Sequence, residues 1–305
     1  MSKLLTIGIP TYNRSSKLAK LLYFLEDEIY ASNCESAVEV IVSDNCSSDN
    51  TESVVENYIQ QNQCKYIFKY NRNDKNLGLV NNVLKIYEFA EGNYVWVMGD
   101  DDIYHSGIIA KVLSEVKKNI YSFIFINHCL YENFKGDETY IPTMLNGVNP
   151  ERTDKEVLLD ITERSGTCLM YISATILKMS AFNELKNYKF EINLAYPLFM
   201  SFFAASIGKT KIIPEVLIDD VCAVTSWDAK ATQVFCNLVP KVLRELPKIG
   251  YSERWVQTYK QHMKRRGEKY SLISFIKKSI SNPRWAAASF LKHTYRLKNL
   301  IQLFD

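Results

Sequence analysis

Short apolar runs alternate with longer amphipathic stretches over about the first 130 residues. Five runs rich in β-branched and aromatic residues predict buried strands, at 4–9, 38–43, 66–70, 94–98 and 123–127. Four stretches between them carry apolar residues at helical spacing, at 15–30, 50–61, 79–90 and 106–119. Strands separated by helices of this length form βαβ units, so the sequence predicts an α/β fold with a mainly parallel sheet flanked by helices.

The pattern changes after the fifth strand. Residues 153–166 and 193–208 are predicted to be helical, and residues 211–218 to form a late strand. Because Pro214 cannot donate a ladder hydrogen bond, we expect that strand at an edge of the sheet. From residue 229 onward the pattern is helical. We therefore expect a sheet-containing domain over 1–228 and a helical C-terminal appendage over 229–305.

Composition narrows the possible classes. Of 305 residues, 47% are hydrophobic and 23% charged, which allows a sizeable core and excludes global disorder. The seven cysteines include no CxxC pair, which argues against a zinc ribbon or a disulfide framework and is typical of a reducing compartment. The first residues predict a strand rather than a signal peptide, and no apolar run is long enough for a membrane-spanning helix.

Several common sites are not indicated. The sequence has no GxGxxG, GxxxxGK[ST] or GxSxG motif, so a nicotinamide enzyme, a P-loop and a serine hydrolase elbow are not expected. The four histidines lack ligand spacing, which argues against zinc. His128 ends a predicted strand, and we expect it to be a hydrogen-bonded structural residue.

Polar motifs follow four of the predicted strands. They are PTYNR (10–14), SDNCSSDNT (43–51), NDKNLGLVNN (73–82) and GDDD (99–102). Because ligands of parallel α/β sheets bind beyond the carboxyl ends of the strands, we expect these four segments to meet in one site.

The aspartates of the fourth motif concentrate negative charge at one point. Mutual repulsion among Asp100, Asp101 and Asp102 is costly unless a cation neutralises it. Carboxylate oxygens suit Mg²⁺ or Mn²⁺, which keep positions open for substrate phosphates. The competing interpretation is a solvated acidic turn that precedes the helix at 106–119.

Asp44 follows the second strand in the same way. A carboxylate there can accept a hydrogen bond from a nucleotide base or a ribose hydroxyl. The alternative is an Asx-turn, with Asp49 or Asn50 capping the helix at 50–61.

These four motifs, in this order and at these spacings, resemble the family 2 glycosyltransferases of the GT-A fold, a Rossmann-like arrangement. The similarity covers about residues 4–130. The nearest resemblance is to bacterial transferases of O-antigen and other surface polysaccharides, such as abequosyltransferase. Residues further along match only loosely.

The resemblance implies roles for individual positions. It implies that the first loop contacts the nucleotide, through Pro10, Thr11, Tyr12 and Arg14. It makes Asp44 the acidic residue that binds the base or ribose. It places Asn76, Gly78 and Asn82 against the nucleotide, where they shape the donor pocket.

The resemblance also implies a divalent cation, Mn²⁺ or Mg²⁺, held through the DxD motif. Asp101 is the first choice for its carboxylate ligand, with Asp102 beside it. Where the family usually has Asp, this chain has Gly99, so a ribose contact is lost and Asp100 is the candidate to compensate for it. An inverting reaction also needs a carboxylate base near the acceptor, for which Glu191 is the candidate; a surface residue near a helix N-terminus is the alternative.

The C-terminal region is strongly basic. Residues 229–305 contain 16 Lys or Arg and 4 Asp or Glu, whereas residues 1–228 contain 21 basic and 30 acidic residues. Basic helices interleaved with aromatic residues, as over 252–305, favour contact with an anionic membrane surface. The alternative is a helical bundle with a solvated basic face. Nucleic acid is disfavoured because no known binding module is present.

Together these features predict a metal-dependent glycosyltransferase that transfers a hexosyl or deoxyhexosyl group. It would move sugar from a nucleotide diphosphate-sugar donor to a polyprenyl-pyrophosphate-linked glycan, as in O-antigen or lipopolysaccharide biosynthesis. We expect it in the cytoplasm, peripherally bound to the inner face of the cytoplasmic membrane. A nucleotidyltransferase and a non-catalytic nucleotide- or membrane-binding module are the alternatives.

Overall fold

The computed structural model describes residues 3–61, 65–134, 137–141, 143–145, 147–166, 168–221 and 233–267. The chain divides into two compact units. The first comprises Met1–Ile192 and Met200–Cys222, and the second comprises Asn193–Phe199 and Ala223–Asp305. Among the described helices, none has both the length and the apolar character needed to cross a bilayer.

The strands belong to the first unit. They are β1 (Leu5–Thr11), β2 (Val38–Asp44), β3 (Ile67–Arg72), β4 (Tyr94–Val97), β5 (Ile103–Tyr104), β6 (Tyr121–Phe134), β7 (Asp137–Ile141), β8 (Thr175–Lys178) and β9 (Lys209–Val221). In the described part of the chain they form one sheet of order β3-β2-β1-β4-β8-β6-β9-β5, with β7 paired to β6. The first four strands are parallel, and β8 enters antiparallel between β4 and β6.

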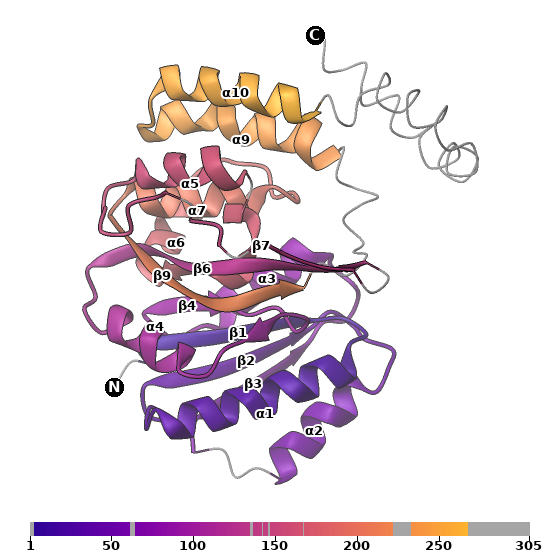
Figure 1. Cartoon of the computed structure of the whole chain (residues 1–305). Helices are drawn as coiled ribbons and strands as arrows, with labels where there is room; N and C mark the ends of the chain where they lie inside the picture. Colours follow the sequence, from indigo (N-terminus) through magenta and orange to yellow (C-terminus); the bar gives the residue numbers. More distant parts are fainter. Residues whose placement is uncertain are drawn as a thin grey trace, which may run out of the picture. The chain divides into compact units, whose positions relative to one another are not determined.

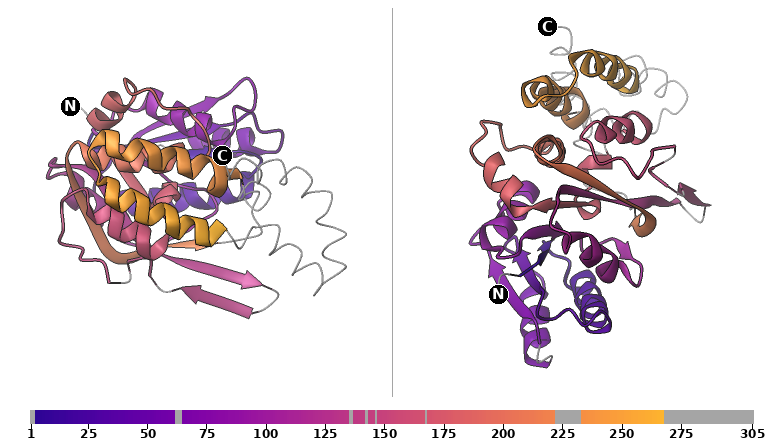
Figure 2. Two further views of the ribbon diagram at one scale, coloured as in Figure 1. Left: turned by 90° about the horizontal axis from the view of Figure 1, so that it is seen from above. Right: turned by 90° about the vertical axis from the view of Figure 1, so that its left-hand side faces the viewer.

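The helices of the first unit cover the sheet (Figure 1). They are α1 (Ser15–Ala31), α2 (Thr51–Gln61), α3 (Leu79–Phe89), α4 (Ile108–Val116), α5 (Val157–Ser165), α6 (Met179–Leu185) and most of α7 (Tyr196–Ser206). The second unit has α9 (Val239–Glu245) and α10 (Glu253–Gly267), which run side by side in Figure 2. Short 3-10 turns cover Cys168–Met170, Ile172–Ala174 and Leu246–Ile249, and a π-helical turn covers Val234–Leu238.

Burial on both faces explains the continuous apolar runs of the first strands. Ile7 of β1, Val40 of β2 and Trp96 of β4 share one core with residues of α1, α2 and α4. On the other face, a side chain at Gly8 would collide with Ile86 of α3. The absent side chain therefore lets α3 pack directly against β1, and the predicted GT-A-like sheet flanked by helices is confirmed.

The prediction that 211–218 forms an edge strand is partly right: among the described residues β6 is the paired neighbour over most of this stretch, and the two-residue β5 pairs at Ile218 and Asp219. Strand β9 lies between β6, which is parallel to it, and β5, which is antiparallel. The β6–β9 register shifts between the pairs Ile126↔Ile213 and His128↔Ile218, and Pro214 lies within that irregularity. Its missing N–H therefore costs no ladder hydrogen bond, and its carbonyl accepts one from Asn127 Nδ2 at 2.8 Å.

In the second unit, the aromatic residues near the start of α10 are packed rather than displayed. Tyr259 is buried and stacks on Trp255, with ring centroids 4.8 Å apart. Val256 and Tyr251 are also buried. This part of the basic region therefore has its own apolar core, as expected for a packed bundle. Residues 268–305, which carry most of the predicted membrane-binding charge, lie outside the described residues.

Candidate functional site

The four polar motifs meet at one edge of the sheet. Strands β3, β2, β1 and β4 are adjacent and parallel, so the segments after them leave the sheet on the same side. Backbone hydrogen bonds join these segments: Asn45 N donates to Thr11 O, and Asn73 N donates to Asp44 O, both at 2.9 Å. The expected convergence is thus present.

Asp100 ties the segment after β4 to the loop after β1. It is almost completely buried, its Oδ2 accepts a hydrogen bond from Thr11 Oγ1 at 2.7 Å, and its Oδ1 lies 2.8 Å from Arg14 Nη1. Burial raises the pKa of Asp100, although Arg14 and Thr11 oppose that shift. Both carboxylate oxygens of Asp100 therefore contact residues of the first loop.

Asp101 is partly exposed beside two basic side chains. Its side chain is 29% exposed, and its Oδ2 lies 2.8 Å from Arg14 Nη1 and 4.0 Å from Lys17 Nζ. Basic side chains from the first loop and the start of α1 therefore converge on this carboxylate. It is the aspartate of the motif that combines partial exposure with cationic partners.

Asp102 folds back toward the sheet. Its Oδ2 accepts a hydrogen bond from Ser173 Oγ at 2.6 Å, and burial raises the pKa of Asp102 to about 7, with the charges of Asp101 and Asp220 acting in the same direction. A Cβ added at Gly99 would lie 2.6 Å from that same oxygen. The Asp102 carboxylate thus fills the space that a side chain at position 99 would need.

Asp220 of β9 joins this group, and it was not among the site residues predicted from the sequence. The antiparallel pairing of β5 with β9 sets Ile103 opposite Asp219, so the same register brings Asp220 opposite Asp102. Burial raises the pKa of Asp220 to about 6, and the charge of Asp101 adds to this. The two consecutive acidic residues near the end of β9 were the signal in the sequence that could have found Asp220. The strand that brings Asp220 to the site, β5, has only two residues and was not predicted.

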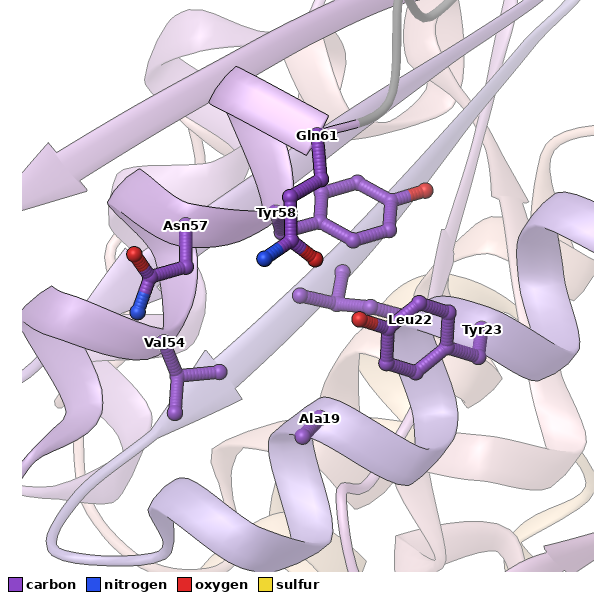
Figure 3. A pocket seen from close by; sticks show the side chains of 7 residues that line it. All are labelled: Ala19, Leu22, Tyr23, Val54, Asn57, Tyr58 and Gln61. Carbon is purple, nitrogen blue, oxygen red and sulfur yellow. The ribbon is translucent and has the colours of Figure 1, made fainter.

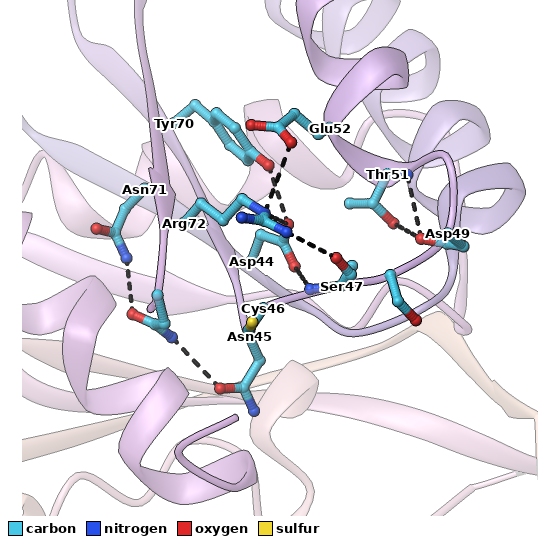
Figure 4. Close-up of polar contacts among 12 residues, drawn as sticks. Asp44, Asn45, Cys46, Ser47, Asp49, Thr51, Glu52, Tyr70, Asn71 and Arg72 are labelled. Atoms are coloured by element: carbon cyan, nitrogen blue, oxygen red, sulfur yellow. Dashed lines mark hydrogen bonds and ion pairs between the residues drawn. The ribbon is translucent and has the colours of Figure 1, made fainter. Parts of the chain in front are cut away.

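Asp44 is buried beneath the loop that follows β2 (Figure 4). Its Oδ1 accepts a hydrogen bond from Ser47 N at 2.9 Å, and its Oδ2 accepts one from Tyr70 OH at 2.9 Å and lies 3.6 Å from Arg72 Nε. Burial and the Asp44 charge raise the pKa of Tyr70. The carboxylate therefore organises its own loop through a backbone N–H three residues on, whereas the two-residue Asx-turn of the alternative interpretation is made by Asp49 with Thr51 N.

Asp49 joins the beginnings of two helices. Its Oδ1 accepts from Thr51 N at 3.1 Å, and its Oδ2 accepts from Ser15 N at 3.0 Å. Partial burial opposes ionisation, but these hydrogen bonds outweigh it and lower the pKa of Asp49. The capping role at α2, which was the alternative interpretation, is therefore present, and Asp49 also caps the first residue of α1.

A chain of amides connects the second and third motifs. The buried Asn82 donates from Nδ2 to Ser43 O at 2.8 Å and accepts at Oδ1 from Ser43 Oγ and Asn73 Nδ2. Asn45 Nδ2 donates to Asn76 Oδ1 at 3.0 Å. This network fixes the loop that carries the third motif. Asn45 and Asn73 were not among the predicted site residues.

Gly78 ends that loop at the start of α3. Its φ of 79° and ψ of 161° lie in a region that L side chains rarely adopt, and its N–H donates to Asn76 Oδ1 at 2.8 Å. The backbone conformation at this position therefore favours glycine, whose predicted role was to shape the donor pocket.

The first loop begins while still in the sheet. Pro10 and Thr11 pair with Ser43 and Asp44 in the β1–β2 ladder, whereas Tyr12 is 44% exposed. Glu191 is also exposed and precedes α7, which begins at Tyr196. Its role as a base stays a prediction.

The donor set of the site fits a hard cation shared with a substrate. Among the described residues, no group of three or more His, Cys, Asp and Glu side chains could hold a metal ion by itself. Mg²⁺ and Mn²⁺ commonly take one or two carboxylates and complete their shell with water and phosphate oxygens. Asp101 and Asp102 offer oxygen ligands of that kind.

His128 takes no part in this edge as a charged group. It is 2% exposed, with its ring 4.7 Å from that of Tyr171 and 5.7 Å from that of Phe125, between centroids. Burial lowers the pKa of His128 to about 4. It is a buried structural residue, as expected.

A separate hollow of about 220 Å³ lies between α1 and α2 (Figure 3). It is lined by Ala19, Leu22, Tyr23, Val54, Asn57, Tyr58 and Gln61. None of the residues discussed above as site candidates lines it, so we treat it as distinct from the candidate site.

Two curated relatives share part of this sequence. The abequosyltransferase RfbV of Salmonella typhimurium is 34% identical over 99 residues, which are 32% of this chain and 28% of that protein. The GalNAc(5)-diNAcBac-PP-undecaprenol beta-1,3-glucosyltransferase of Campylobacter jejuni is 28% identical over 183 residues, which are 59% of this chain and 55% of that protein. The chain therefore spans at most about half of these two relatives' lengths.

Two solved structures share the fold. The structure of S. aureus TarS 1–349 in complex with UDP-GlcNAc has a TM-score of 0.61 at 16% identity, and covers 83% of this chain and 69% of that one. The mannosyltransferase PcManGT of Pyrobaculum calidifontis, in complex with GDP-Man and Mn²⁺, has a TM-score of 0.55 at 13% identity, and covers 98% and 88%.

The family assignment comes from the sequence itself. Residues 6–177, more than half of the chain, match the family model described as glycosyl transferase family 2. The matched segment contains all four polar motifs and the sheet edge where they converge. The chain belongs to glycosyl transferase family 2 and has the GT-A fold.

Proposed function

We propose that this chain is a metal-dependent glycosyltransferase that moves a sugar from a nucleotide diphosphate-sugar to a lipid-linked surface glycan. The observation that carries the proposal is the position of Asp101: a partly exposed carboxylate beside a buried strand end, with Arg14 at 2.8 Å and Asp102 next in the chain. Carboxylates and a guanidinium at one point suit a site for a cation and a diphosphate.

The donor lies across the carboxyl ends of β1, β2 and β4 in this proposal. The exposed Tyr12 contacts the base or sugar, Asp44 supports the loop that faces the base and ribose, and Asn76 and Gly78 border the donor pocket. Pro10, Thr11 and Asn82 hold these loops in place. Two nucleotide-sugar complexes among the structural neighbours support a donor of this class.

Asp101 and Asp102 hold Mn²⁺ or Mg²⁺ in the proposal, and the neighbour with bound Mn²⁺ supports it. When bound, the cation stabilises the negative charge on the departing diphosphate. Asp100, buried and bonded to Thr11 and Arg14, keeps the segment after β4 in register with the first loop. Glu191 accepts the acceptor's proton if the reaction inverts configuration.

The acceptor is a polyprenyl-pyrophosphate-linked glycan in this proposal. Support comes from the name of the C. jejuni relative, which specifies an undecaprenol-linked substrate, and from the excess of basic residues over 229–305. We propose that residues 1–228 bind the donor and catalyse transfer. The basic region 229–305 then holds the enzyme peripherally at the inner face of the cytoplasmic membrane.

The test is a donor screen followed by a transfer assay. Thermal unfolding is measured with CDP, UDP, GDP and dTDP, each with Mn²⁺ and with EDTA, to identify the base that stabilises the protein most. Sugar nucleotides of that base are then assayed for Mn²⁺-dependent release of the nucleoside diphosphate. We expect the wild type to release the nucleoside diphosphate, and Asp101→Asn to release it at least about a hundredfold more slowly. Equal rates for the two proteins would contradict the proposal.

A further inference from the structure

The carboxylate proposed to hold the cation already has a cationic partner. One guanidinium nitrogen, Arg14 Nη1, lies 2.8 Å from Asp100 Oδ1 and 2.8 Å from Asp101 Oδ2. The bridge sets one positive charge against two negative ones, so it offsets part of the charge of the two aspartates without any bound ion. A divalent cation that binds Asp101 must therefore compete with a side chain of the protein.

The two halves of this bridge differ in how easily they are broken. The Asp100 side chain is 1% exposed and also accepts a hydrogen bond from Thr11, whereas that of Asp101 is 29% exposed. The Arg14 side chain is 43% exposed and stands just before α1. Because one nitrogen makes both contacts, the contact that gives way is the one to the exposed Asp101, while Nη1 keeps the buried Asp100 and the other guanidinium nitrogens stay free to turn.

Charge repulsion and attraction set the direction in which the Arg14 side chain moves. A divalent ion at Asp101 repels a guanidinium at 2.8 Å from the same oxygen, and this repulsion is strong in a partly buried site. A diphosphate beside that ion offers Arg14 new acceptors, and a planar guanidinium binds phosphate oxygens with paired hydrogen bonds.

We propose that Arg14 is an exchange residue: it holds Asp101 until the cation arrives, then releases that carboxylate and turns to the diphosphate of the donor. This inference rests on the proposed function and adds a regulatory step to it. It makes binding of the metal alone weak and binding of metal with nucleotide strong, because only the second event gives Arg14 a replacement partner.

The proposal predicts changes of opposite sign for one substitution. In Arg14→Ala, Mn²⁺ alone binds about five- to tenfold more tightly than in the wild type, because its competitor is gone. The nucleoside diphosphate chosen by the donor screen binds about tenfold more weakly in the presence of Mn²⁺, because a phosphate contact is lost. A purely structural arginine would weaken both equilibria or neither.

Titration calorimetry measures both equilibria on the full-length chain. Arg14→Lys keeps the charge but loses the planar fork, so it gives intermediate values for both. Lys17→Ala is the matched control: Lys17 Nζ lies 4.0 Å from Asp101, and the change shifts each affinity less than twofold, approximately. Because Arg14→Ala leaves Asp100 with a buried charge, Arg14→Ala/Asp100→Asn is measured in parallel, with thermal unfolding as the check on folding.

The outcomes separate this inference from the proposed function. Metal-dependent nucleotide binding by the wild type, with unchanged or weaker Mn²⁺ affinity in both Arg14→Ala proteins, leaves the glycosyltransferase proposal standing and overturns the exchange role. No metal-dependent nucleotide binding by the wild type overturns both. Tighter Mn²⁺ binding together with weaker nucleotide binding supports the exchange.

Discussion

The three consecutive aspartates after β4 lie in three different environments. Asp100 is buried against Thr11 and Arg14, Asp101 is partly exposed, and Asp102 accepts a hydrogen bond from Ser173. The charge cluster and its place at a strand end could be predicted from the sequence. The different environments of the three aspartates could not be predicted, because they depend on Ser173, more than 70 positions away, and on the absence of a side chain at Gly99.

Gly99 gives a prediction at this scale. In Gly99→Ala the new Cβ would stand 2.6 Å from Asp102 Oδ2 and 3.1 Å from Ser173 Oγ, so the carboxylate must move and its hydrogen bond is disturbed. We expect a loss of about 1–3 kcal/mol in the free energy of unfolding, measured with urea. Asp102→Ala removes the obstructing group, so adding Gly99→Ala to it should cost much less. Additive losses in this double-mutant cycle would argue against the contact.

At the scale of elements, the periodic patterns predicted the first half of the fold well. Each of the four βα units follows its apolar run, because amphipathic helices and the strands β1, β2 and β4, which are buried on both faces, leave strong local signals. Strand β3, which was predicted to be buried, instead lies at the end of the strand order, and its residues are exposed or half-buried. Strand β9 shows the limit. Its proline indicated an edge, and β5 pairs with only two residues of the strand, Ile218 and Asp219; a register shift against β6 accommodates Pro214 before that point. Such a shift depends on the partner strand, which local sequence does not specify.

Strand β6 carries a prediction about pH. The pKa of the buried His128 is lowered from 6.5 to about 4, so between these values the unfolded chain binds a proton that the folded chain does not. This part of the stability is present above pH 6.5 and is lost as the pH falls toward 4, by up to about 1.4 kcal/mol per pH unit.

Urea unfolding of the wild type and of His128→Asn across that range isolates this effect from other titrating groups. We expect the free energy of unfolding of the wild type to fall more steeply with decreasing pH than that of the variant. Parallel curves would show that His128 is not held neutral in the folded protein.

At the scale of the whole molecule, charge is unevenly divided along the chain. The 16 basic residues of 229–305 contrast with the acidic excess of 1–228. The sequence made this segregation plain, but it left open whether the aromatic residues among the charges are displayed or packed. Tyr259 and Val256 are buried in the second unit, so an apolar core accounts for part of that pattern.

The remaining charge gives a membrane prediction. The full chain should float with vesicles containing anionic lipid and not with neutral ones, because each basic residue near such a surface contributes about 1 kcal/mol. Neutralising Lys264, Arg265, Arg266 and Lys269 to Gln should reduce the fraction of protein that floats, because four of the 16 basic residues of this region are removed. The matched control neutralises Lys65, Lys155, Lys186 and Lys189, and should float normally. Equal behaviour of the two variants would leave the basic region without a membrane role.

The central claim is that Asp101 couples a divalent cation to the diphosphate of a nucleotide. Calorimetric titration of the preferred nucleoside diphosphate, with Mn²⁺ and with EDTA, tests it on the wild type and on Asp101→Asn. The account predicts at least about tenfold tighter binding with Mn²⁺ for the wild type, and no metal effect for the variant. The same affinity in Mn²⁺ and EDTA for the wild type, or an undiminished metal effect in Asp101→Asn, would contradict it.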